Sequence, residues 1–117
     1  MDRRVVITGL GIVAPNGVGL DAFLDAIQNG KSGIRFDQQL ADLQFSCQIS
    51  GTPQITEEKK RGYFSELELR NFNATGILYG VMAGTDAWKD AGLAMETNDD
   101  PDWDSGTIFG TGTSGIE

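Results

Sequence analysis

The sequence has 117 residues with nine Lys or Arg and 17 Asp or Glu, so the net charge at pH 7 is −8. Such an acidic chain lacks the basic face that neutralises phosphates, which excludes nucleic acid as the expected partner. The single cysteine, Cys47, excludes an internal disulfide, and the absence of histidine removes most metal sites and every catalytic arrangement that needs histidine. The apolar stretch after Arg4 is too short for a signal peptide, so we expect a cytoplasmic protein.

The first expected element is a strand over residues 5–7, because Val5-Val6-Ile7 is a β-branched run typical of a strand covered on both faces. A glycine-rich loop follows. Apolar residues from Leu20 then recur at i, i+3, i+4 and i+7, which predicts a short helix closed by Asn29-Gly30. The order strand, loop, helix predicts an α/β unit.

A second strand is expected between Leu43 and Ile49, where alternation places Phe45 and Cys47 on the same half-buried side as these two residues. We therefore interpret Cys47 as a core residue. Its alternative role as a nucleophile needs a neighbouring base, and the chain has no histidine to serve as one.

Two features precede a long helix. The mixed-charge run from Thr56 to Arg61 is interpreted as solvated surface. Ser65 and Glu68 have the spacing of a capping box, which predicts a helix start. The main helix is expected over residues 73–91, with Gly92 as its left-handed stop.

Gly76, Gly80 and Gly84 recur at every fourth residue of that helix and form one line along it, called the glycine ridge below. Three glycines in a helix cost about 3 kcal/mol relative to alanine. Close approach of another backbone would offset this cost. The same spacing occurs in transmembrane dimers, but polar residues interrupt the apolar run, so a buried helix of a soluble core is preferred and no membrane partner is expected.

Residues 97–105 are an acidic loop that lacks the alternating ligands and terminal glutamate of a calcium loop, so we interpret it as a surface connection and expect no metal. A short strand is expected over residues 107–109, followed by a glycine-rich segment. An alternative interpretation concerns Gly9-Leu10-Gly11 with Ala14, which match a dinucleotide-binding fingerprint. That fingerprint needs a helix that starts inside the turn, and Pro15 with the glycines after it would break such a helix.

Several ordered motifs carry a family resemblance that covers essentially the entire chain, most firmly residues 3–34 and 77–117. They are Val5-Val6-Ile7-Thr8-Gly9-Leu10-Gly11 followed by Pro15, Asn29-Gly30-Lys31-Ser32-Gly33-Ile34, Tyr79-Gly80 with Ala83-Gly84, Asp90-Ala91-Gly92-Leu93 and the Gly110 to Gly115 loop. Together they resemble β-ketoacyl-acyl-carrier-protein synthases, in particular condensing enzymes of the 3-oxoacyl-acyl-carrier-protein synthase II type.

The resemblance implies an α/β, thiolase-like αβαβα layered fold, of which residues 1–117 would be the opening part of the first half and a partial N-terminal ketoacyl-synthase domain. Such enzymes catalyse decarboxylative Claisen condensation of acyl and malonyl thioesters in fatty-acid or polyketide synthesis. The family's cysteine and two histidines would lie beyond Glu117, so no catalytic residue is assigned here. Neither a metal nor an organic cofactor is implied.

The implied partners are the acyl carrier protein, the remainder of the synthase polypeptide and a homodimer or heterodimer partner. One departure affects docking of the acidic carrier. Relatives usually carry basic residues before the long helix, whereas this chain keeps only Arg70 there. The candidate docking residues are therefore Lys59, Lys60, Arg61 and Arg70.

Two alternatives remain open. The first is a non-catalytic, chain-length-factor-like subunit of a type II polyketide or polyene system, which keeps the fold and lacks the cysteine. The second is a small self-contained binding domain. The expected strands argue against the second, because they are too few to cover the helices on both faces. Truncation, cleavage or a separate second chain would each explain the length.

Overall fold

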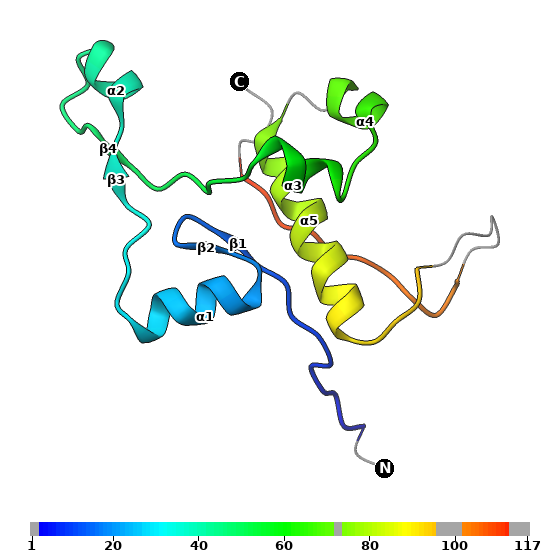
Figure 1. Ribbon diagram of the computed structural model, residues 1–117. Helices are drawn as coiled ribbons and strands as arrows, with labels where there is room; N and C mark the ends of the chain where they lie inside the picture. The colour runs from blue at the N-terminus through cyan, green and yellow to red at the C-terminus, as the bar shows by residue number, and fades with distance from the viewer. Residues whose placement is uncertain (1–2, 72–73, 96–101, 113–117) are drawn as a thin grey trace.

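The computed structural model describes residues 3–71, 74–95 and 102–112 (Figure 1). Its helices and short strands are, in chain order, β1 (Val13–Ala14), β2 (Gly17–Val18), α1 (Leu20–Gln28), β3 (Arg35–Phe36), α2 (Gln38–Asp42), β4 (Ile49–Ser50), α3 (Glu57–Arg61), α4 (Glu66–Asn71) and α5 (Thr75–Asp90). Figure 1 shows α5 as the longest element, with α3 and α4 near one end of it, α1 beside the β1–β2 hairpin, and β3, α2 and β4 in a projecting arm.

Both sheets in the described residues are two-stranded and antiparallel. Val13 pairs with Val18 in the first sheet, and Phe36 pairs with Ile49 in the second. A parallel α/β unit is not among these elements, so the layered αβαβα architecture is not confirmed by the described part of the chain.

The strands expected over residues 5–7 and 107–109 are not formed. The side chains of Val5, Ile7 and Ile108 are 92%, 84% and 101% exposed. A β-branched run becomes a strand only when another strand pairs with it, because its N–H and C=O groups need partners in a ladder. No described segment pairs with either run.

The prediction of a strand between residues 43 and 49 was also wrong for most of that range, because the observed strand β4 covers only Ile49–Ser50. The Asp37 carboxylate accepts hydrogen bonds from the backbone N–H of Gln39 at 3.0 Å and the Ser50 hydroxyl at 2.7 Å, so it caps α2 and binds β4. Gln44 then has a φ of 56°, a left-handed conformation that breaks the alternation. Cys47 is exposed and is not a core residue, which corrects its expected burial.

Three local predictions are confirmed. The first helix runs over Leu20–Gln28 and is followed by Gly30 at a φ of 62°. Ser65 and Glu68 form the expected capping box: the Ser65 N–H donates to the Glu68 carboxylate at 2.8 Å, and the Glu68 N–H donates to the Ser65 hydroxyl at 3.3 Å. The Ser65 N–H and hydroxyl both donate to the Glu68 carboxylate at 2.8 Å, and these two bonds hold the pKa of Glu68 below its usual value. The long helix ends before Gly92, whose φ is 73°.

The buried cluster is small and lies between α5 and the segment that carries α3. It consists of Phe64, Leu78 and Met82, with Met82 completely buried. Partly buried hydrophobic side chains surround it: Val13, Val18, Ile55, Tyr63 and Leu69.

The surface is large for a protein of this size. The accessible area is 9590 Å², whereas a compact monomer of 12.6 kDa exposes roughly 6,200 Å². The excess includes many apolar side chains, so the described elements do not close a complete core around themselves.

A close approach between two backbones lies on one face of α5. A Cβ atom built on Gly11 would collide with the carbonyl oxygen of Ala83, and one built on Gly9 would stand 2.5 Å from the N of Ala91 and 2.8 Å from its Cβ. Ala83, Ala87 and Ala91 follow one another at every fourth residue and form the alanine face of α5. Residues 9–11 therefore lie against this face with no side chain between the two backbones.

The glycine ridge faces an aromatic ring. Cβ atoms on Gly80 and Gly84 would lie 3.6 Å and 3.3 Å from the ring of Phe109. Among the described residues this ring, and not a backbone, comes nearest to these two positions. The role of the ridge in close backbone packing stays a prediction. Within the described ranges, no helix combines the length and the hydropathy that a bilayer-spanning segment needs.

Tyr63 connects the segment after α3 to α5. Its hydroxyl donates to the Asp86 carboxylate at 2.8 Å, and the ammonium of Lys89 stands 5.4 Å from the centre of its ring. Desolvation, followed by this hydrogen bond and the negative charge of Asp86, raises the pKa of Tyr63 to about 12.

Replacement of Gly11 by alanine tests the alanine face. We expect Gly11→Ala to lower the unfolding free energy by about 1–3 kcal/mol, because the new methyl group overlaps the α5 backbone. Gly80→Ala is the matched control: its methyl group meets Phe109 at ordinary contact distance and improves helix propensity, so stability should rise by up to about 1 kcal/mol. Thermal unfolding of the full-length protein measures both. A destabilising Gly80→Ala would instead show that a backbone covers the glycine ridge.

The pKa of Tyr63 predicts a loss of stability at alkaline pH. An unfolded tyrosine has a pKa near 10, so the contribution of Tyr63 is complete below pH ~10 and is lost as the pH rises through 12. Tyr63→Phe should remove this part of the pH dependence, and Tyr79→Phe should retain it. Denaturant unfolding at a series of alkaline pH values measures the effect. If the unfolding free energy of wild type and of Tyr63→Phe fell equally with pH, the prediction would be wrong.

Candidate functional site

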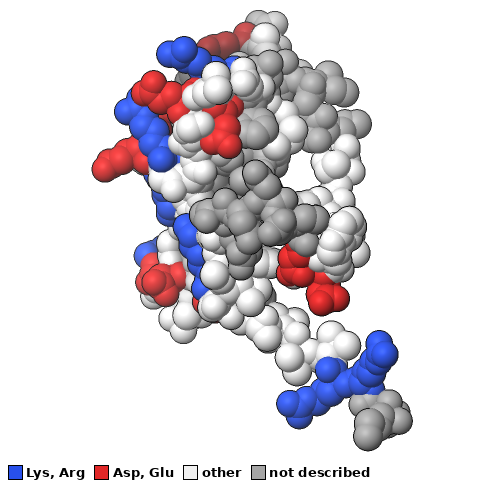
Figure 2. All heavy atoms as spheres, turned by 90° about the vertical axis from the view of Figure 1, so that its right-hand side faces the viewer, with Lys and Arg blue, Asp and Glu red and all other residues white. Residues whose placement is uncertain are grey.

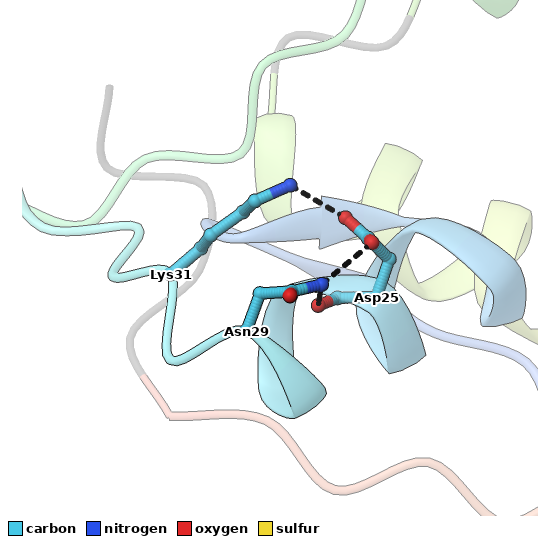
Figure 3. Close-up of polar contacts among 3 residues, drawn as sticks. All are labelled: Asp25, Asn29 and Lys31. Atoms are coloured by element: carbon cyan, nitrogen blue, oxygen red, sulfur yellow. Dashed lines mark hydrogen bonds and ion pairs between the residues drawn. The ribbon is translucent and has the colours of Figure 1, made fainter.

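Asn29 and Lys31, from the family-like motif after α1, form a polar cluster with Asp25 (Figure 3). The Asn29 amide donates to the backbone carbonyl of Asp25 at 2.9 Å and to its carboxylate at 2.8 Å. The Lys31 ammonium binds the second carboxylate oxygen at 2.6 Å. The hydrogen bond and charge of Lys31 hold the pKa of Asp25 below its usual value. The motif therefore ends the helix and turns the chain.

The next residues of the motif place the chain against the first hairpin. A Cβ atom on Gly33 would stand 2.4 Å or less from the backbone of Pro15 and Asn16, so only glycine fits there. The Arg35 guanidinium donates to the carbonyl of Pro15 at 3.1 Å. Gly33 and Pro15, both parts of the family-like motifs, are thus in direct contact.

The mixed-charge run after Thr56 forms the short helix α3. The Thr56 hydroxyl accepts from the N–H of Lys59 at 3.2 Å and caps the helix. Glu57 and Glu58 stand in its first turn and the three cations in its last turn, an order that the helix dipole favours. The run is largely exposed, as expected for solvated surface.

The candidate docking residues of α3 have different surroundings. The Lys59 ammonium donates to the backbone carbonyl of Val18 at 2.9 Å. The Lys60 ammonium binds Glu57 at 2.7 Å, and its hydrogen bond holds the pKa of that carboxyl below its usual value. Arg61 is exposed. Two of the three cations are therefore engaged by neighbours.

Arg70, the fourth candidate docking residue, is exposed in the last turn of α4. Figure 1 places α4 near α3, beside the same end of α5. Figure 2 shows basic side chains interspersed with acidic ones on the face that it presents. A partner that docks here would meet individual cations.

Two shallow apolar grooves follow the glycine ridge. One has a volume of about 280 Å³ and lies between Gly76, Gly80 and Phe109. The other has a volume of about 450 Å³ and lies beside Gly84, Trp88 and Met95. Both lie between α5 and the segment of residues 102–112. The ridge residues thus line surface that is open in the described chain.

The described residues hold no built catalytic or metal site. The Cys47 thiol lies 3.9 Å from the carbonyl of Ile49, a weak contact, and the sequence has no histidine to activate it. No group of three potential metal ligands was found among the described residues. Residues 96–101 of the acidic loop lie outside the described residues.

The dinucleotide interpretation is excluded by the geometry at Gly9 and Gly11. A hairpin follows these glycines and the first helix begins only at Leu20, so no helix N-terminus is available for a pyrophosphate. The Leu10 N–H instead donates to the Asp90 carboxylate at 2.9 Å. The glycines serve the contact with α5.

Sequence reasoning missed two features of this region. The spacing of Ala83, Ala87 and Ala91 was a usable signal for the close contact with Gly9 and Gly11, because small residues at every fourth position share one helix face. The bond from Lys59 to Val18 left no signal, since the two residues are 41 positions apart.

Comparisons with known proteins agree on one family over nearly the whole chain. The family described as "Beta-ketoacyl synthase, N-terminal domain" matches residues 2–116. The 3-oxoacyl-[acyl-carrier-protein] synthase 2 of Vibrio cholerae is 31% identical over 115 residues, which cover 98% of this chain and 27% of that protein.

Other relatives give the same result. A protein of Streptomyces halstedii named as a polyketide beta-ketoacyl synthase is 31% identical over 98% of this chain and 26% of its own length. The 3-oxoacyl-[acyl-carrier-protein] synthase 1 of Escherichia coli is 32% identical over 80% of this chain and 22% of its own length. The chain spans about a quarter of the length of these curated relatives. On this evidence the chain belongs to the β-ketoacyl synthase family of condensing enzymes and matches its N-terminal domain.

Proposed function

We propose that this chain is the N-terminal part of a 3-oxoacyl-acyl-carrier-protein synthase that catalyses decarboxylative Claisen condensation of acyl and malonyl thioesters. The observation that carries the proposal is the family match over residues 2–116, supported by relatives named as synthases of this class. The reaction joins two carbon skeletons as carbon dioxide leaves, and it needs no metal or organic cofactor.

In this proposal the chain contributes scaffold rather than chemistry. A cysteine nucleophile and two histidines would come from polypeptide outside residues 1–117, since the sequence holds no histidine that could activate the exposed Cys47. The close contact of residues 9–11 with α5 would position the elements that support the site. The apolar side chains of Val5, Ile7 and Ile108 would be covered by the other layers of a thiolase-like fold.

The proposed partner is an acyl carrier protein, together with a second condensing-enzyme subunit as homodimer or heterodimer. An acidic carrier would be received on the surface of α3 and α4, where the candidate docking residues Lys59, Lys60, Arg61 and Arg70 lie. The neighbours of Lys59 and Lys60 leave Arg61 and Arg70 as the exposed cations that form no ion pair within the described residues. Exposed cations contribute mainly to the rate of encounter and to orientation. Because the net charge of the chain is −8, an acidic partner would be attracted only where cations such as these gather on the surface.

A chain-length-factor-like subunit is the second candidate function. The relative from Streptomyces halstedii named as a polyketide synthase favours a polyketide system, in which this alternative arises. The two candidates differ in whether the complete protein carries the nucleophilic cysteine.

Labelling of the full-length protein with a thiol-directed condensing-enzyme inhibitor separates these candidates. We expect mass spectrometry to locate the adduct on a cysteine outside residues 1–117. Cys47→Ala is the control: it should leave condensation intact and change stability by less than about 0.5 kcal/mol, because the side chain is exposed. An adduct confined to Cys47 would refute the synthase proposal, and a complete absence of adduct would favour the chain-length-factor subunit.

Isolated residues 1–117 should not form a cooperative domain. The large accessible surface and the small cluster around Met82 leave too little buried apolar area to offset the loss of chain entropy. A proton-nitrogen spectrum of the segment should show poor dispersion that improves when the remaining polypeptide is added. A well-dispersed monomeric spectrum with a cooperative melt would instead support a self-contained binding domain.

A further inference from the structure

Two polar contacts, one within the short helix α3 and one just after it, connect this segment to the rest of the fold. Within the helix, the Lys59 ammonium donates to the Val18 carbonyl in β2 at 2.9 Å. Just after it, the Tyr63 hydroxyl donates to Asp86 in α5 at 2.8 Å. The residues of these two pairs are 41 and 23 positions apart, so each bond links segments that are distant in sequence.

The same segments meet in the apolar cluster around Met82. Val18 from the hairpin, and Ile55 and Tyr63 from either side of α3, are all partly buried against this cluster. The bond from Lys59 therefore joins two segments that already pack against a common core. It adds a polar link between α3 and β2 to this apolar contact.

The other two cations of α3 differ in their neighbours and in their exposure to solvent. Lys60 is neutralised by Glu57, and its side chain is only 23% exposed. Arg61 is exposed, and its charge is the last and smallest of the influences on the Glu57 carboxyl. An arginine also offers a planar group suited to paired hydrogen bonds with a carboxylate.

We propose that Lys59 is a positioning residue that holds α3 against the β1–β2 hairpin, and that Arg61 is the cation of α3 that contacts an acidic partner. The assignment of Lys59 stands on the geometry alone. The assignment of Arg61 rests on the proposed function, because it takes the acidic partner to be the acyl carrier protein. Within one short helix, adjacent basic residues thus serve different purposes.

Four variants of the full-length protein test this division: Lys59→Gln, Lys59→Arg, Arg61→Gln and, as a control for the loss of one positive charge elsewhere, Lys31→Gln after α1. Hydrogen exchange followed by mass spectrometry measures protection of the hairpin over residues 13–19. Fluorescence anisotropy with the labelled acyl carrier protein of the source organism, at low and high salt, measures docking.

We expect Lys59→Gln to raise hairpin exchange roughly 2- to 10-fold, as loss of one intramolecular hydrogen bond predicts, while carrier affinity stays equal to that of Lys31→Gln. Lys59→Arg keeps a donor and should retain most of the protection. Arg61→Gln should weaken carrier binding at low salt roughly 2- to 5-fold, as expected for one exposed ion pair, with hairpin exchange unchanged.

Weaker carrier binding in Lys59→Gln with unchanged hairpin exchange would overturn the proposal, because Lys59 would then be a docking residue. Increased exchange in Lys59→Gln with no effect of Arg61→Gln on binding would confirm the role of Lys59 and overturn the role of Arg61. That second result would also place carrier docking away from α3, while cysteine labelling would still decide the synthase proposal independently.

Discussion

The contact between residues 9–11 and the alanine face of α5 is the constraint on which the rest of the described fold depends. Gly9 and Gly11 lie so close to Ala87 and Ala83 that no side chain fits between the two backbones. This contact fixes where the chain enters the β1–β2 hairpin. The hairpin in turn contacts both α5 and α1, so the position of α1 follows from the same contact.

Polar contacts then refine the arrangement that this close approach establishes. Leu10, within the contact, donates its N–H to Asp90 of α5. Lys59 and Tyr63 connect the region of α3 to β2 and α5. Each of these bonds is exposed or partly exposed, so each contributes little on its own. Each bond links segments that are distant in the sequence, and hydrogen bonds depend on direction as well as distance.

Membership of the β-ketoacyl synthase family gives these features a functional context. The motif from Asn29 to Gly33, which carries part of the resemblance, closes α1 through Asp25 and turns the chain onto Pro15. These contacts determine the backbone path after α1. The glycine ridge is different: it borders apolar grooves beside Phe109 and is available to further polypeptide. Scaffold and contact surface are the two contributions that the described residues support.

The sequence by itself determined the features that depend on neighbouring residues. The first and last helices, the Ser65–Glu68 capping box and the stop at Gly92 all form through local hydrogen bonds, so composition and spacing were sufficient. The ordered motifs were also enough to identify the family.

Only the tertiary structure decided features that need a distant partner. The runs at Val5 and Ile108 had every local property of strands, yet no described segment pairs with them. Alternation predicted a buried Cys47, but the cap at Asp37 and the left-handed Gln44 turned that segment into an exposed arm. The hydrogen bond from Lys59 to the Val18 carbonyl likewise joins residues that are far apart in the sequence. A strand ladder or a long-range hydrogen bond requires two distant segments to come into contact, and local sequence patterns do not show which segments do so.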